Sequence, residues 1–200
     1  MKRIIATSIA ALAFAACSHK PAPAPAPELA PAKPPTVPMK AQAVLKPAKG
    51  SKVSGTITFV EEGGKTTVYS TVENLKKGAH GFHIHETGDC TDAAAGFKKA
   101  GGHFNPTQHV HADVIVTPRH VGDLGNLVAD SKNKVNTSMT VEGLPLGGPE
   151  SIIGKAVIIH KNKDDGKTQP TGNSGDRLAC AVIESLPSAE QTPGPIESPK

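Results

Sequence analysis

Histidine is the residue type best able to do chemistry in this 200-residue sequence, which contains nine histidines, most of them closely spaced. His83 and His85 lie two residues apart in the stretch AHGFHIH. If this stretch is a strand, the alternation of side chains places both imidazoles on one face and points Phe82 and Ile84 into the core. Two imidazoles on the same face can bind one metal ion.

A second group of candidate ligands follows in GGHFNPTQHVHADVIVTPRHVGDLG. It contains His103, His109, His111, His120 and Asp123. Three histidines and one aspartate are a chemically reasonable tetrahedral zinc set, because zinc accepts imidazole nitrogen and carboxylate oxygen. His109 and His111 are only two residues apart, so either could supply the middle histidine.

A further histidine extends the first group. His160 ends the apolar stretch KAVIIH, and with His83 and His85 it would give three imidazoles at one metal ion. All-imidazole sites suit copper as well as zinc. Six or more candidate ligands in one small domain therefore predict two metal ions rather than one.

The cysteines bear on the cellular compartment. Residues 1–17, MKRIIATSIAALAFAAC, carry two cations, an apolar stretch and small residues before Cys17, which is typical of a secretory signal. An exported protein meets an oxidising compartment, where Cys90 and Cys180 most simply form a disulfide. The alternative is that Cys90 joins the metal ligands as a thiolate, which would leave Cys180 unpaired.

Both ends of the chain differ in composition from its middle. Ala15-Ala16-Cys17 resembles a bacterial lipoprotein cleavage site, which would make Cys17 the lipidated first residue, whereas simple cleavage nearby would give a soluble product. Residues 18–49 are proline-rich, so we expect an extended spacer. Residues 185–200 have a disordered composition. The folded domain is predicted to span residues 50–184.

Composition excludes several classes of protein. The 22 basic and 18 acidic residues give a net charge of +4, and two of the basic residues lie in the leader, which argues against nucleic-acid binding. Five phenylalanines, one tyrosine and no tryptophan argue against a base-stacking surface. After the leader no apolar run is long enough to predict a membrane span.

The sequence around these histidines has almost no helical periodicity. It predicts short strands separated by glycine clusters. The expected strands are 53–60, 66–75, 79–85, 114–116, 135–144, 155–160 and 178–184. Glu61-Glu62-Gly63-Gly64 predicts a hairpin turn between the first two. This pattern favours an antiparallel sandwich or barrel. Two stretches without a strand pattern, 86–113 and 161–177, are bounded by histidines and are expected to be functional loops.

Five segments resemble the copper,zinc superoxide dismutase family: GFHIHETGDC, AGGHFNP, RHVGDLGNL, SIIGKAVIIHKNKDD and TGNSGDRLAC. The resemblance covers nearly all of 50–184, in order. The steps of eight, nine and three residues from His103 through His111 and His120 to Asp123 also match the family's metal loop. The implied fold is all-β: a Greek-key antiparallel β-sandwich or flattened eight-stranded barrel, immunoglobulin-like, with two long functional loops.

The resemblance also implies roles for individual residues. The implied copper ligands are His83, His85, His103 and His160. The implied zinc ligands are His103, His111, His120 and Asp123, with His103 bridging the two metals and His111 favoured over His109. Asp164 matches a carboxylate that ties a copper ligand to a zinc ligand, Arg177 matches the arginine beside the copper, and Cys90 and Cys180 match the family's disulfide.

The implied reaction is the dismutation of superoxide to dioxygen and hydrogen peroxide, with Arg177 and His103 as the catalytic residues. The implied cofactors are one copper and one zinc per subunit, of which only copper changes oxidation state. Superoxide would be the substrate, no nucleic acid would bind, and a lipid on Cys17 would be the only membrane contact. The family's bacterial members include both monomers and homodimers.

The position of Cys90 directly after Gly88-Asp89 is similar to the bacterial exported branch of the family, which predicts a role in defending the cell envelope or periplasm against superoxide. Two alternatives are a metal carrier and a structural lipoprotein of the envelope. A carrier would need neither a bridging His103 nor Arg177. A purely structural role would not explain the six ordered ligand positions.

Three further features lie outside the implied metal ligands. His80 matches a position that hydrogen-bonds within the scaffold of the family, so we expect it to be structural. Lys161, Lys163 and Lys167 either add to the positive field around Arg177 or are solvated loop charges. The apolar run at 113–117 would form a short strand or a contact surface.

Overall fold

The computed structural model describes residues 38–187, which form nine β-strands and two short 3-10 helices. The strands are β1 (Met39–Pro47), β2 (Ser54–Glu62), β3 (Lys65–Glu73), β4 (Gly78–His85), β5 (Asp123–Ala129), β6 (Lys134–Glu142), β7 (Ala156–His160), β8 (Arg177–Val182) and β9 (Glu184–Leu186). The helices are η1 (Ala93–Ala95) and η2 (Lys98–Ala100). This content confirms the all-β prediction.

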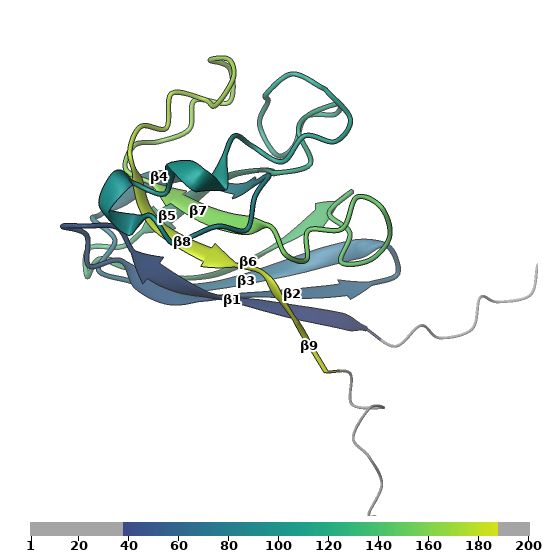
Figure 1. Cartoon of the computed structure of the whole chain (residues 1–200), viewed down its shortest axis with the longest axis horizontal. Coiled ribbons are helices and arrows are strands. Elements are labelled where there is room, and N and C mark those ends of the chain that lie inside the picture. Colours follow the sequence, from purple (N-terminus) through teal and green to yellow (C-terminus); the bar gives the residue numbers. More distant parts are fainter. Residues whose placement is uncertain (1–37, 188–200) are drawn as a thin grey trace, which may run out of the picture. The chain divides into compact units, whose positions relative to one another are not determined.

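The strands pair antiparallel in the order β5-β4-β7-β8-β1-β2-β3-β6, and β9 pairs with β1. β1 joins two layers, because most of it pairs with β2 while its end pairs with β8. Figure 1 shows β1, β2, β3 and β6 in one layer and β4, β5, β7 and β8 in the other. The apolar core draws on both layers. The result is the predicted flattened eight-stranded barrel, nearly closed.

The turn between β2 and β3 confirms the predicted hairpin. Glu62 pairs with Lys65, so the loop consists of Gly63 and Gly64 alone. Both glycines have positive φ, 60° and 81°, which a two-residue hairpin of this kind requires and which side chains disfavour. The hairpin therefore sets the register between β2 and β3, which belong to the layer opposite the histidines.

The predicted end of the proline-rich spacer at residue 49 is wrong, because β1 lies inside that segment. Ala41, Ala43 and Leu45 alternate along β1 and are buried in the core. Pro47 is the last residue of the strand, so it does not stand in the middle, where proline would remove a ladder hydrogen bond. The high proline content of the neighbouring sequence hid this alternation. The sheet therefore begins at residue 39 rather than 50, and β9 extends it past the predicted end at 184.

Two further predictions about strands are corrected. Residues 114–116 form turns and bends instead of a strand, because Asp113 starts a turn in which its carbonyl accepts the Val116 amide and its carboxylate accepts the Ile115 amide. β5 was not predicted. Its pairing with β4 contains a register shift, and Leu124 and Leu127 are both buried although they are three residues apart.

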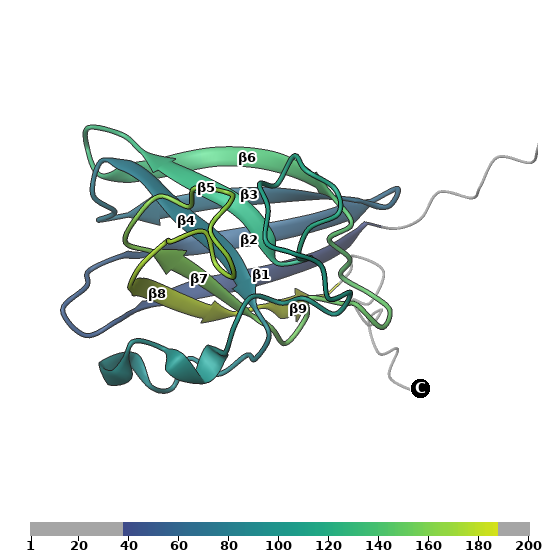
Figure 2. The ribbon, with the colours of Figure 1, turned by 90° about the horizontal axis from the view of Figure 1, so that it is seen from above.

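Two long loops, residues 104–122 and 161–176, lie over the β4, β5 and β7 side of the barrel, as the two views together show (Figures 1 and 2). Among residues 38–187 no helix is long and apolar enough to cross a membrane. The predicted signal peptide at 1–17, the lipidated Cys17, the rest of the spacer and most of the tail lie outside the described residues.

Candidate metal centre

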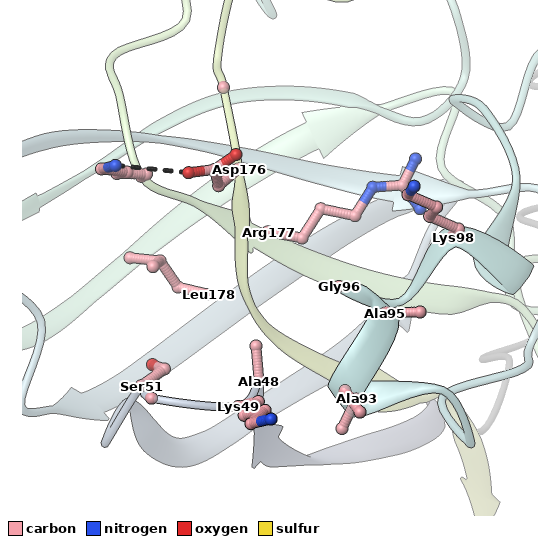
Figure 3. A pocket seen from close by; sticks show the side chains of 14 residues that line it. Ala48, Lys49, Ser51, Ala93, Ala95, Gly96, Lys98, Asp176, Arg177 and Leu178 are labelled. Atoms are coloured by element: carbon pink, nitrogen blue, oxygen red, sulfur yellow. Dashed lines mark hydrogen bonds and ion pairs between the residues drawn. The ribbon is translucent and has the colours of Figure 1, made fainter.

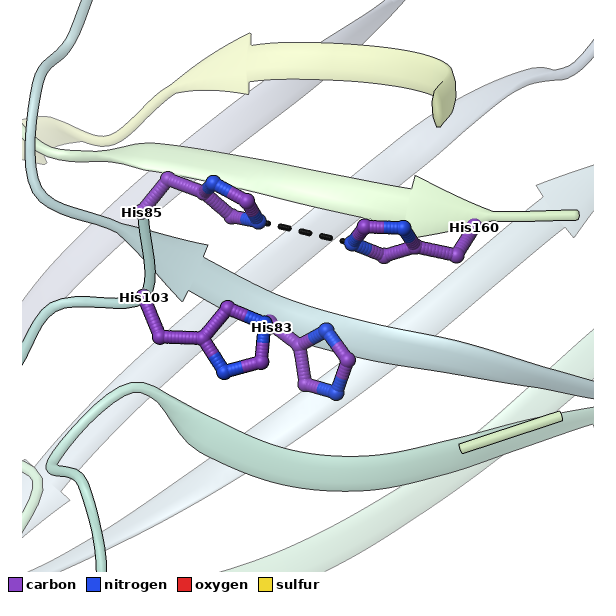
Figure 4. A group of neighbouring side chains, drawn as sticks. All are labelled: His83, His85, His103 and His160. Atoms are coloured by element: carbon purple, nitrogen blue, oxygen red, sulfur yellow. Dashed lines mark hydrogen bonds between the residues drawn. The ribbon is translucent and has the colours of Figure 1, made fainter. Parts of the chain in front are cut away.

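Four buried histidines converge from three parts of the chain (Figure 4). His83 and His85 lie on one face of β4, while Phe82 and Ile84 pack in the apolar core, as the alternation predicts. His160 is the last residue of β7, and His103 pairs with His85 through an isolated bridge. One ring nitrogen from each histidine lies within 4.8 Å of the others.

The free nitrogens of this group suit a copper ion. Nε2 of His83 lies 2.6 Å from the Asp164 carboxylate, and Nδ1 of His85 lies 2.9 Å from the Gly101 carbonyl oxygen. One nitrogen of each ring is therefore already bonded. Nδ1 of His83 and Nε2 of His103 are buried without a partner among the described residues. A buried polar atom without a partner is destabilising. A metal ion held by imidazole nitrogens would satisfy both atoms, so these residues fit a copper ion.

The second group shares His103 with the first. Nδ1 of His103, His111 and His120 lies 2.8, 3.0 and 3.2 Å from Oδ1 of Asp123. These four ligand atoms also lie within 4.8 Å of one another. Three imidazole nitrogens and one carboxylate oxygen are the donors that tetrahedral zinc takes. The other oxygen of Asp123 accepts backbone N–H groups of Ala112 and His120, which orients the carboxylate.

Asp164 links the two groups. Its Oδ2 lies 2.6 Å from Nε2 of His83, and its Oδ1 lies 3.0 Å from Nε2 of His111. Burial alone would raise the pKa of Asp164, but these imidazoles and the Gly166 amide lower it below its usual range. The carboxylate therefore stays ionised and can fix both rings, in the position that the resemblance implies.

Burial sets the protonation of the first group in the metal-free protein. It lowers the pKa of His83 to about 4, against the opposing effect of the Asp164 hydrogen bond. Burial and then neighbouring imidazoles hold the pKa of His85 and of His160 well below the usual range. All three rings are therefore neutral at neutral pH, which is the form that binds a metal.

Two side chains that no sequence motif indicated hold the backbone of this centre. The Asn126 amide donates to the Asp164 carbonyl at 3.0 Å and accepts the Asp164 N–H at 2.8 Å. Gln169 does the same for His111: its Oε1 accepts the His111 N–H at 2.9 Å, and its Nε2 donates to the His111 carbonyl at 2.7 Å. Gln169 thereby ties the second long loop to the first.

Arg177 is anchored beside the first group by a loop that a disulfide fixes. Its Nη1 donates to the Phe97 carbonyl and its Nη2 donates to the Gly101 carbonyl at 2.6 Å. Cys90 and Cys180 form the predicted disulfide, with Cα atoms 5.7 Å apart, which excludes Cys90 as a thiolate ligand. The bridge packs with the buried Phe97 against β7 and β8, so it holds the segment that anchors Arg177.

Arg177 also lines an open cavity of about 610 Å³ (Figure 3). Lys161, one of the three predicted lysines, lines this cavity but pairs with Asp176 at 3.2 Å. Lys49 and Lys98 also line it, although no sequence motif indicated them. The charged residues that line this cavity are therefore mainly basic.

The remaining histidines lie outside both groups. His109 is exposed, and the Asn105 amide makes two hydrogen bonds to its backbone, so the structure places His111 rather than His109 in the second group. His80 is buried, with its ring nitrogens 2.9 and 2.7 Å from the carbonyl oxygens of His160 and Lys76. These bonds within the scaffold agree with its expected structural role.

Comparison with known proteins agrees with this geometry. Residues 53–183 match the family described as copper/zinc superoxide dismutase (SODC). The match covers more than half of the chain, so the chain belongs to this family. It is therefore an oxidoreductase of the copper/zinc superoxide dismutase class, with copper and zinc as cofactors.

A solved structure, described as a crystal structure analysis of the clock protein EA4, is also similar. Its TM-score is 0.68 and its sequence identity 38%, over 76% of this chain and 97% of that chain.

Proposed function

We propose that this chain converts two superoxide anions and two protons into dioxygen and hydrogen peroxide at the two histidine groups. One observation carries the proposal: His103 belongs to both groups, with Nδ1 in the zinc set and a buried, unpartnered Nε2 in the copper set. Arg177 is anchored through the same Gly101 carbonyl that bonds to His85. A metal carrier would need neither feature.

The metal ions and Arg177 would have different roles in the proposed reaction. Copper, when bound by His83, His85, His103 and His160, supplies the electron transfer, while zinc keeps a single oxidation state. Arg177 uses two of its five N–H donors on backbone carbonyls, which leaves three to bind the superoxide anion. Burial lowers the pKa of Arg177, yet a guanidinium remains a cation at neutral pH.

His103 is the proposed proton carrier. Its Nε2 can bind either copper or a proton, and when it is not bound to copper it can hold a proton and deliver it to the oxygen that becomes peroxide, because no described residue occupies that nitrogen. Its Nδ1 stays with the zinc donors at 2.8 Å from Asp123, so the ring keeps its place while the proton moves. Each dismutation consumes two protons, which balances the charge of two superoxide anions.

Replacing His160 tests the proposal. In the copper- and zinc-loaded chain, His160→Ala should lower superoxide consumption by more than about 100-fold, because it removes an inferred copper ligand. Copper content should fall while zinc content stays. His109→Ala is the matched control, since His109 is exposed and outside both groups, and it should leave both unchanged. Unchanged consumption in His160→Ala would contradict the proposal.

We also infer that the protein works in a bacterial cell envelope, held to a membrane by a lipid on Cys17 and belonging to the exported branch of the family. The signal pattern of residues 1–17 supports this, and so does the Cys90–Cys180 disulfide, because disulfides persist in oxidising compartments. Cys17→Ala should move the protein from the membrane fraction to the soluble fraction. Recovery of wild type in the soluble fraction would contradict the anchor.

A further inference from the structure

One backbone carbonyl receives both an inferred copper ligand and the inferred substrate-binding arginine. Nδ1 of His85 lies 2.9 Å from the Gly101 oxygen, and Nη2 of Arg177 donates to the same oxygen at 2.6 Å. The position of this single atom therefore sets the orientation of both side chains. Whatever fixes the peptide group between Gly101 and Gly102 fixes part of the active centre.

The N–H end of that peptide group is held by a carboxylate. The Gly102 amide donates to Oε1 of Glu86 at 2.9 Å, and the Glu86 amide donates back to the Gly102 carbonyl at 3.0 Å. Because a peptide unit is planar, fixing its N–H also fixes the direction of its C=O. Glu86 thus grips the peptide from the side opposite to His85 and Arg177.

The local sequence makes this grip necessary. Gly101 and Gly102 are consecutive glycines, the residue type with the greatest backbone freedom. Gly101 has φ 75° and ψ −152°, a conformation that is essentially restricted to glycine. A Cβ added to Gly101 would overlap the Glu86 carboxylate. No side chain at Gly101 can therefore stiffen this peptide, whereas a bond from Glu86 can.

The acceptor is also charged, which affects the other end of the peptide. A hydrogen bond to a carboxylate is stronger than a neutral one, and it polarises the amide to which it is made. The polarised Gly101 oxygen is a better acceptor for the Arg177 guanidinium. Among residues 38–187 the Glu86 carboxylate has no ion-pair partner and bonds only to the Gly102 amide.

We propose that Glu86 is a positioning residue: by holding the Gly102 amide, it aims the Gly101 carbonyl at His85 and Arg177. The proposal rests on the proposed roles of those two residues. It predicts that anion binding beside the copper weakens when the acceptor at position 86 is removed, even though no residue in contact with the anion has changed.

Comparing Glu86→Gln with Glu86→Ala isolates this effect, because both lose the charge and only the alanine variant loses the acceptor. Azide serves as the probe, titrated into the copper- and zinc-loaded full chain and followed by copper(II) absorbance. Its dissociation constant should be about three- to tenfold higher in Glu86→Ala than in Glu86→Gln, as expected for one net hydrogen bond. The copper(II) electron paramagnetic resonance spectrum should change in the alanine variant as well.

Glu61 offers a matched control. Its carboxylate also accepts a loop amide, that of Leu146 at 2.7 Å, but it lies outside both histidine groups. Glu61→Ala should therefore leave azide affinity and the copper spectrum unchanged. If Glu86→Ala does not fold, Glu86→Asp replaces it, since a shorter carboxylate keeps the charge but withdraws from the Gly102 amide. Equal azide affinity and equal spectra in the Gln and Ala variants, or in wild type and the Asp variant, would overturn the proposal.

A readout without copper separates this inference from the proposed function. In the metal-free chain, exchange of the Arg177 guanidinium protons, measured by nuclear magnetic resonance, should be about three- to tenfold faster in Glu86→Ala than in Glu86→Gln. Faster exchange together with an inactive wild type would leave the positioning role standing while the proposed reaction fails. Equal exchange in the two variants would overturn the positioning role even in an active enzyme.

Discussion

The His111 ring has a carboxylate at each nitrogen, Asp123 at 3.0 Å from Nδ1 and Asp164 at 3.0 Å from Nε2. Burial alone would lower the pKa of His111, but the two carboxylates raise it to about 9. The metal-free folded protein therefore holds a proton on this ring at neutral pH. That proton stabilises the fold below pH 6.5, and its contribution is lost as the pH rises through 9.

Zinc must displace this proton. We expect zinc binding to release about one proton at pH 7.5 and progressively fewer as the pH rises through 9, so affinity should rise by about tenfold per pH unit near pH 7.5 and level off above the pKa. Calorimetric titration of the metal-free chain in two buffers of different ionisation enthalpy measures the release. Asp164→Asn, which removes one carboxylate, should reduce it. Proton release that does not depend on pH across this range would contradict the assignment.

The sequence predicted the members of both histidine groups, because metal ligands have characteristic residue types and spacing. It did not predict Asn126, Gln169 or Glu86. These side chains act on backbone N–H and C=O groups, and such contacts depend on which loops meet rather than on any motif. The resemblance favoured His111 over His109, and the fold agrees with that choice, because His111 is buried beside Asp123 whereas His109 is exposed.

At the scale of elements, β1 provides a test from two neighbouring residues. Leu45 is 5% exposed and packs in the core, whereas Val44 points outward and is 61% exposed. In the full chain, Leu45→Ala should lower the free energy of unfolding by about 2–4 kcal/mol. Val44→Ala should change it by less than about 0.5 kcal/mol. Denaturant unfolding measures both, and equal small effects would mean that β1 is not part of the core.

The sequence predicted some strands well and missed others, and the differences have physical reasons. Strands with simple alternation, such as β2 and β3, were placed within a few residues. β1 was missed because its alternating residues use small alanines and lie between prolines. β5 was missed because the register shift opposite β4 breaks the period of two. Residues 114–116 are apolar enough for a strand, but they lack a neighbouring strand among the described pairs, and Asp113 turns the chain there.

At the scale of the whole molecule, the flattened barrel brings together residues that lie far apart in the sequence. β4 and β7 pair directly, which places His83 and His85 near His160, and β8 brings Arg177 to the same side. The resemblance to known sequences predicted this architecture. It could not show that the cavity beside Arg177 is lined by Lys49 and Lys98, because these residues come from separate loops that meet only in the folded chain.

In the proposed enzyme, two metal ions share His103. Anomalous diffraction at the copper and zinc absorption edges, from crystals of the copper- and zinc-loaded chain, tests it directly. We expect one copper peak bound by Nδ1 of His83 and Nε2 of His103, and one zinc peak bound by Nδ1 of His103 and Oδ1 of Asp123. A single metal peak, or copper and zinc peaks that do not both contact His103, would show that the two metals do not share this histidine.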